Sequence, residues 1–317
     1  MYYEYYGLNR PPFQLTLDRL CVYFGAGQRD AMAQLLYGIR EGKGLLVLEG
    51  EPGTGKTTLL DALTAMLPAH MNMPVCWLRN AMLRAPIDLL EAILLGYRRG
   101  CARGARIGEV SERLFQFLAE CAGGGLAPLL IVDEAQELRP RAMKQLRLLT
   151  NWERDGQAMI RIILAGQTEL GRRYLDAPAH AALRQRVTLR CRLRALPENE
   201  TADYVRLRLR EAGGSCREIF SPEALAELHF HAGGVPRRIN VLADHSLVAG
   251  YAAGQRPVAG MTVAMAAAEL GYSPAGDGAA PAPPPPDPVD VELKDLFRAF
   301  LCEDARSLPG TLTGAPQ

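Results

Sequence analysis

Short apolar runs rich in Leu, Ile and Val alternate with stretches of helical period over the first two thirds of the chain. This alternation is typical of parallel strands joined by crossover helices. The runs predict buried strands at residues 45–48, 75–78, 129–132, 160–164 and 187–193. We therefore expect an α/β domain over residues 1–195, with helices flanking a parallel sheet and an N-terminal extension at residues 1–28.

After Pro197 the pattern is wholly helical, and the segments begin at a capping Ser or Thr or end at Gly or Pro. A small all-helical domain is predicted over residues 196–272. Residues 273–290 are rich in proline and poor in core-forming side chains, which favours an extended linker. The tail at 291–317 is either a poorly ordered terminus or a partner-binding peptide. Its apolar residues have the spacing of a short amphipathic helix: Leu293, Leu296, Phe297 and Phe300.

Charge and composition narrow the classes of protein. The 36 basic and 35 acidic side chains give a net charge of +1, too balanced for a chain that coats nucleic acid over its whole surface. No uncharged apolar run reaches the roughly 18 residues of a membrane span. The N-terminus carries Glu4 and resembles no secretory signal, so we expect a cytoplasmic protein. The seven cysteines are scattered without a CxxC pair and are expected to be reduced.

The most specific motif is GEPGTGKT at residues 50–57, which fits GxxxxGK[ST] in full. It follows a predicted strand and precedes a helical segment. The glycines let backbone N–H groups turn toward phosphates at the start of the helix. Lys56 is expected to reach the β- and γ-phosphates of ATP, and Thr57 to contact Mg²⁺. The predicted nucleotide-binding residues here are Gly50, Glu51, Pro52, Gly53, Thr54, Gly55, Lys56, Thr57 and Thr58.

A second apolar strand ends on two adjacent carboxylates, Asp133 and Glu134. Carboxylates in this position cost desolvation energy unless a cation lies nearby. We expect Asp133 to hold Mg²⁺, mostly through water, and Glu134 to polarise the water that attacks the γ-phosphate. Two surface acids that cap the next helix are the alternative. The phosphate-binding motif upstream favours the catalytic interpretation.

Two further polar residues are expected to face the γ-phosphate. Gln167 follows a predicted strand, and its amide would reach the phosphate from between the loop and the acidic strand. Arg237 lies in the first turn of a predicted helix, where a cation opposes the helix dipole unless an anion compensates. A triphosphate would supply that anion. The alternative for Arg237 is an ordinary exposed side chain.

Arginines gather between residues 184 and 194, beside the last predicted strand. Such a cluster can be an arginine finger, a nucleic-acid surface or the solvated face of an edge strand. Alternation favours the edge interpretation for Arg190, Arg192 and Arg194. Arg186, at the junction of helix and strand, is the finger candidate, and Arg184 is second. A finger from a neighbouring subunit raises the rate ~10³- to 10⁵-fold and implies a ring or filament.

The motifs in this order resemble the ATPases of the general secretion pathway protein A group, which includes the MSHA pilus protein MshM and the exosortase-associated ATPases, within the AAA+ superfamily. The matching segments are YYGLNRPPFQLT (5–16), GEPGTGKT (50–57), IVDEAQ (131–136), LRLLTNWE (146–153), AGQTEL (165–170), LRQRV (183–187) and GGVPRRIN (233–240).

The resemblance implies an AAA+ P-loop domain followed by a helical lid. It also implies Walker A roles for Lys56 and Thr57, and Walker B roles for Asp133 and Glu134. Roles for three further residues follow in the same way: sensor 1 for Gln167, the finger for Arg186 and sensor 2 for Arg237. Longer members of the group continue into a membrane span and a peptidoglycan-binding domain. In their place this sequence has the proline-rich linker and tail, which we expect to attach to another subunit.

The leading hypothesis is a self-assembling ATPase that binds and hydrolyses Mg-ATP to drive or switch assembly of a secretion, pilus or polysaccharide-export apparatus. Contact with the inner membrane would then run through a partner. A DNA-binding regulator of transposition, similar to TniB, TnsC and MuB, is one alternative; the near-zero net charge disfavours it and the arginine cluster favours it. A scaffold that binds ATP with little turnover is the other.

Overall fold

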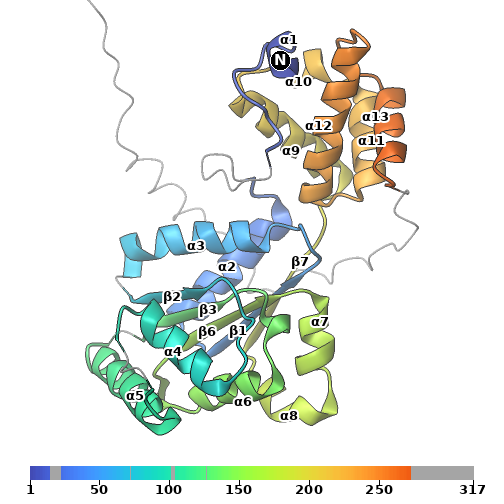
Figure 1. Cartoon of the computed structure of the whole chain (residues 1–317). Coiled ribbons are helices and arrows are strands. Elements are labelled where there is room, and N and C mark those ends of the chain that lie inside the picture. The colour runs from blue at the N-terminus through green and yellow to red at the C-terminus, as the bar shows by residue number, and fades with distance from the viewer. Residues whose placement is uncertain (15–22, 72, 101–103, 126, 273–317) are drawn as a thin grey trace, which may run out of the picture.

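The computed structural model describes residues 1–14, 23–71, 73–100, 104–125 and 127–272. They form a sheet-containing domain and a helical domain (Figure 1). The sheet is parallel, with strand order β2-β3-β6-β1-β7. The strands are β1 (Leu45–Gly50), β2 (Val75–Leu78), β3 (Leu129–Val132), β6 (Arg161–Gly166) and β7 (Leu189–Leu193). Each coincides with a predicted strand to within two residues at either end, and the predicted P-loop α/β fold is confirmed.

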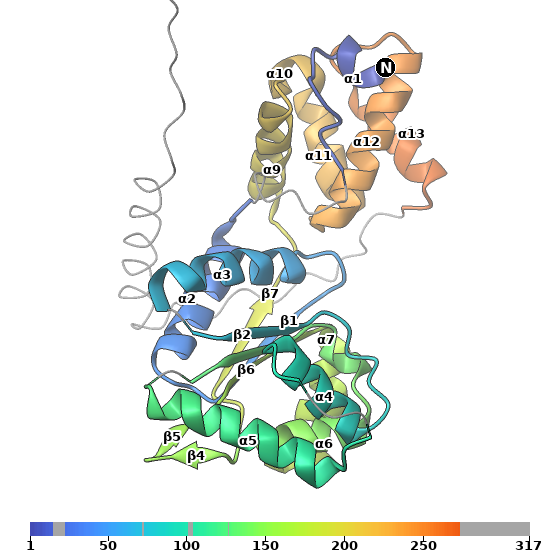
Figure 2. The same cartoon turned by 60° about the vertical axis from the view of Figure 1, so that its left-hand side comes forward.

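Both faces of the sheet are covered, which explains the continuous apolar runs. Along β1, Leu45 and Val47 enter one hydrophobic cluster, whereas Leu46 and Leu48 enter the other. Figures 1 and 2 show α2 and α3 over one face and α4, α5 and α6 over the opposite face. The bounds are α2 (Ala26–Arg40), α3 (Lys56–Met71), α4 (Pro86–Gly96), α5 (Ile107–Gly123) and α6 (Pro140–Leu149).

Short elements connect the main ones. After β3 comes a 3₁₀ turn, η1 (Ala135–Glu137), and four further short helices lie between β6 and β7. These are α7 (Thr168–Leu170), η2 (Gly171–Leu175), η3 (Pro178–His180) and α8 (Ala181–Arg184). The antiparallel hairpin β4 (Glu153–Arg154) and β5 (Gln157–Ala158) was not predicted. Its turn residues, Asp155 and Gly156, both have positive φ, as in the Asp-Gly turns favoured by two-residue hairpins.

The helical domain has its own hydrophobic core and agrees with the predicted helical region. It contains α9 (Glu198–Glu211), α10 (Cys216–Ile219), α11 (Pro222–Ala232), α12 (Pro236–Ala252) and α13 (Gly260–Glu269). The N-terminal segment, with α1 (Tyr2–Tyr5), packs here rather than on the domain to which the sequence analysis assigned it. Tyr6, Leu8 and Phe13 are all buried in the helical core. The backbone N–H of Asn9 donates to the carbonyl oxygen of Ala212 at 2.8 Å.

Three further expectations concern the C-terminal tail, the cysteines and membrane-spanning helices. The linker and tail predicted from residue 273 onward lie outside the described residues. Four cysteines within the described ranges are free: Cys76, Cys121, Cys191 and Cys216. Among the described helices, none combines the length and the apolar character needed to cross a membrane.

The edge strand β7 carries an ion pair that the sequence analysis did not predict. Its edge position is confirmed, but Arg190 is held by acids rather than only solvated. Its guanidinium donates from Nε to Oε2 of Glu49 at 2.8 Å and from Nη1 to Oδ1 of Asp176 at 3.0 Å. Glu49 on β1 is fully buried. The hydrogen bond to Glu49 raises the pKa of Arg190, and the bond from Arg190 lowers the pKa of Asp176.

Arg190→Ala is expected to destabilise the folded chain by about 2 kcal/mol, because buried Glu49 would lose both hydrogen bonds from Arg190 and keep only the longer ion pair with Arg192 at 3.9 Å. This is below the ~3–5 kcal/mol typical of fully buried pairs, since Arg190 is itself 35% exposed. Urea unfolding provides the measurement. Arg186→Ala is the matched control: its pair with Glu153 is exposed on both sides and contributes only ~0–1 kcal/mol. Equal changes in the free energy of unfolding for the two variants would show that the pair of Arg190 with Glu49 contributes no more than an exposed pair.

Candidate functional site

The loop between β1 and α3 has the backbone that its glycines allow. Gly53 and Gly55 have φ values of +82° and +97°, in the region that favours glycine. Lys56 opens α3 and is 5% exposed. Its Nζ donates to the carbonyl oxygens of Gly50 at 2.8 Å and Glu51 at 3.0 Å. Burial lowers the pKa of Lys56, while nearby carboxylates oppose this shift. An anion at this position would stabilise the buried ammonium group.

The two residues predicted to bind Mg²⁺, Thr57 and Asp133, are hydrogen-bonded to each other. Thr57 donates from Oγ1 to Oδ2 of Asp133 at 2.9 Å, and the backbone N–H of Glu134 donates to Oδ1 at 3.0 Å. Burial raises the pKa of Asp133, and these two hydrogen bonds oppose the shift. A hydroxyl and a carboxylate are hard oxygen ligands, and Mg²⁺ commonly binds one or two such groups together with phosphate oxygens. The two side chains therefore fit Mg²⁺.

Glu134 has an unusual backbone for a residue other than glycine. Its φ of 51° and ψ of 41° place it in the left-handed region, two residues after the end of β3. Such conformations cost of order 1–3 kcal/mol and cluster at functional sites. Its Oε2 accepts hydrogen bonds from Nε2 of Gln136 at 2.5 Å and from Nε2 of Gln167 at 3.4 Å. Both predicted residues, Glu134 and Gln167, line one pocket.

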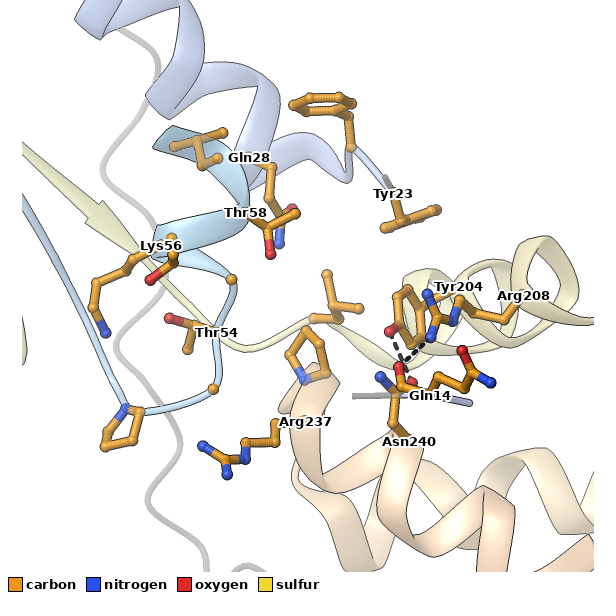
Figure 3. A pocket seen from close by; sticks show the side chains of 18 of the residues that line it. Gln14, Tyr23, Gln28, Thr54, Lys56, Thr58, Tyr204, Arg208, Arg237 and Asn240 are labelled. Carbon is orange, nitrogen blue, oxygen red and sulfur yellow. Dashed lines mark hydrogen bonds between the residues drawn. The ribbon is translucent and has the colours of Figure 1, made fainter. Parts of the chain in front are cut away.

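That pocket lies between the two domains and has a volume of about 470 Å³ (Figure 3). Arg237 reaches it from the first turn of α12, and its side chain extends toward the phosphate-binding loop. Its backbone N–H donates to the carbonyl oxygen of Gly53 at 3.3 Å. A Cβ at position 53 would lie 2.7 Å from the Cβ of Arg237, so this approach of helix to loop requires glycine. The helical domain thus forms one wall of the pocket.

A second group of lining residues was not predicted from the sequence. The pocket is also lined by Gln14, Tyr23, Phe24, Gln28, Tyr204, Arg208 and Asn240. Tyr204 donates to Oδ1 of Asn240 at 2.8 Å, and Arg208 donates to the carbonyl oxygen of Gln14 at 2.7 Å (Figure 3). These residues come from segments far apart in the sequence, and no local motif marks them. Aromatic and polar groups combined in one concave wall are typical of small-molecule sites.

The structure brings most of the predicted residues together. Residues 52–58, Glu134, Gln167 and Arg237 line the pocket. Three more contact residues that line it: Gly50 and Glu51 accept hydrogen bonds from Lys56, and Asp133 accepts one from Thr57. Arg186 and Arg184 lie elsewhere. Both residues come just before β7. Because β7 runs parallel to β1, they lie at the end of the sheet opposite the loop that follows β1. Arg186 is exposed there and pairs with Glu153 at 3.3 Å.

Known proteins with similar sequences include AAA domains and a secretion-pathway protein. A family model described as an AAA domain matches residues 39–174. The chain is 35% identical over 270 residues to general secretion pathway protein A of Aeromonas hydrophila, an alignment that covers 85% of the chain and 48% of that protein. The chain therefore spans about half the length of this curated relative.

Solved structures show the same fold at low sequence identity. Cdc6p of Pyrobaculum aerophilum has a TM-score of 0.62 at 17% identity, over 82% of this chain and 70% of that one. The ORC2 protein of Aeropyrum pernix, in ADPNP-ADP complexes, has a TM-score of 0.58 at 17% identity, over 82% and 71%. RuvB of Thermotoga maritima, a Holliday junction branch migration motor, has a TM-score of 0.51 at 16% identity, over 82% of this chain and 74% of that one. Residues 39–174 thus match an AAA domain and have the P-loop fold, and the chain is similar over 85% of its length to general secretion pathway protein A.

Proposed function

We propose that the pocket binds ATP with Mg²⁺ and hydrolyses it to ADP and phosphate. The observation that carries this proposal is the meeting of four separate elements at one pocket: the glycine loop with Lys56, the carboxylates after β3, Gln167 after β6 and Arg237 on α12. Lys56 and Arg237 approach from opposite domains, as an anion between them would require. Nucleotide complexes of the Aeropyrum pernix ORC2 protein, which has the same fold, support the choice of ligand.

Each side chain has a role that follows from its position. Lys56 would exchange part of its contact with the carbonyl oxygens of Gly50 and Glu51 for phosphate oxygens. Thr57 and Asp133 would hold Mg²⁺, whose charge stabilises the negative charge that develops on the phosphates. Glu134 would orient and polarise the attacking water, and Gln167 would contact the γ-phosphate. The aromatic and polar wall with Tyr23 and Gln28 would take the base and ribose.

The exposed position of Arg186 supports self-assembly. This guanidinium lies at the end of the sheet opposite the phosphate-binding loop, so it would enter the pocket of a neighbouring copy rather than its own. We therefore infer a ring or filament with sites between subunits. The likeness to general secretion pathway protein A supports a role in assembling a secretion apparatus, or a related pilus or polysaccharide-export apparatus, through a protein partner. A cytoplasmic location, with contact to the inner membrane through that partner, completes the proposal.

Lys56→Ala tests the proposed site directly. We expect the Kd for ATP to rise about 100-fold, because the variant loses charge-assisted hydrogen bonds to phosphate, each worth ~1.5–3 kcal/mol. Titration with a fluorescent ATP analogue measures this. Lys144→Ala removes an exposed lysine of α6 and should leave the Kd unchanged. Equal affinity of Lys56→Ala and the wild type would rule out a triphosphate site at this loop.

A further inference from the structure

The side chain of Gln136 connects the two residues that face the γ-phosphate in the proposed function. It is 6% exposed and lies in the 3₁₀ turn after β3. Its Nε2 donates to Oε2 of Glu134 at 2.5 Å, and its Oε1 accepts from the backbone N–H of Gln167 at 3.0 Å. One neutral amide thus joins the end of β3 to the end of β6.

The residues around the Gln136 amide leave space for it. A Cβ at position 166 would lie 2.7 Å from Oε1 of Gln136, so only glycine at the end of β6 leaves room for the amide. The main chain of Gln136 is fixed as well, because Nη1 of Arg173 donates to its carbonyl oxygen at 3.1 Å. The side chain of Gln136 is therefore held by Glu134 and by the end of β6, and its main chain is held by η2.

Such a contact matters because a carboxylate that polarises water must be held to within a fraction of an ångström. Glu134 can rotate about its side-chain bonds, and its strained backbone alone does not fix the carboxylate. Amide donors from Gln136 and Gln167 both reach Oε2. Oε1 is then the oxygen that we assign to the water.

We propose that Gln136 is a positioning residue for ATP hydrolysis, which aligns the carboxylate of Glu134 and couples it to Gln167. This inference rests on the proposed function. Gln136 is not placed against the nucleotide, because it is not among the residues that line the pocket. Its loss should therefore change turnover and leave nucleotide affinity as it is.

The test compares Gln136→Met with the wild type in steady-state phosphate release and in ATP binding. Methionine keeps the length of the side chain and removes both hydrogen bonds. We expect kcat to fall about 10- to 100-fold, with the Kd for ATP within twofold. Gln116→Met is the control, because it breaks a glutamine–glutamate hydrogen bond of 3.0 Å on the exposed face of α5 and should change neither quantity.

Gly166→Ala provides a second variant that leaves Gln136 in the chain and displaces its amide. It should lower kcat similarly, and the double variant Gly166→Ala/Gln136→Met should be no slower than Gln136→Met alone. Additive losses, a kcat unchanged in Gln136→Met, or a matching loss of ATP affinity would each overturn the inference while the proposed ATPase stands. A wild type that binds no ATP would instead overturn the proposed function and this inference with it.

Discussion

Glu134→Gln is expected to reduce the rate of phosphate release about 10³-fold while the Kd for ATP stays within about twofold. Glutamine matches glutamate in shape, but its neutral amide polarises water poorly, and a positioned general base contributes ~10²- to 10⁴-fold. Phosphate release at saturating ATP and equilibrium ATP binding are the two measurements. Glu137→Gln, at an exposed position in the same turn, is the matched control and should retain the wild-type rate.

The two measurements also separate an enzyme from a scaffold. An unchanged rate in Glu134→Gln would remove this carboxylate from catalysis. A wild-type rate already as low as that of the variant, with tight ATP binding, would favour a nucleotide-gated scaffold.

Arg186→Ala is expected to lower the rate of the assembled protein about 10³-fold, at the lower end of the effect of arginine fingers. ATP affinity should change little, because Arg186 does not line its own subunit's pocket. The rate should be measured at protein concentrations where the wild-type rate per subunit no longer rises. Arg184→Ala is compared in the same assay, because Arg184 is exposed in the same segment and is the second candidate. A loss confined to Arg184→Ala would reassign the finger.

Mixing two inactive variants shows whether the finger acts between subunits. An Arg186→Ala subunit keeps Glu134, and a Glu134→Gln subunit keeps Arg186. Where the second meets the pocket of the first, a complete site forms, and activity should return on mixing. Mixtures as inactive as their components would show that Arg186 does not act in a neighbouring subunit's pocket.

The strands of the sheet could be predicted because burial on both faces leaves a plain signal. β1 and β3 are apolar at almost every position and end at turn or charged residues. The phosphate-binding loop and the acidic pair were also predictable, since their chemistry demands fixed residue types at fixed spacing. The hairpin β4–β5 was missed, although the Asp155-Gly156 pair is a strong signal for such a turn.

Other features depend on tertiary contacts that no local pattern encodes. The left-handed backbone of Glu134 has no sequence signature, because glutamate rarely adopts it. Alternation along β7 marked Arg190 as exposed, but it could not reveal a buried acid on the neighbouring strand. The amide of Gln136 and the pocket wall around Tyr204 become recognisable only when separate segments are brought together. The sequence therefore identified the groups expected to act on phosphate, but not those that hold them.

The packing of the N-terminal segment determines how the two domains are connected. Tyr6 and Phe13 belong to the helical core, whereas α2, which begins at Ala26, covers the sheet. The chain therefore passes from one domain to the other twice, once before α2 and once after β7. The helical wall of the pocket is therefore tied to the sheet domain by two covalent connections, and cutting the chain at one of them would leave the other in place.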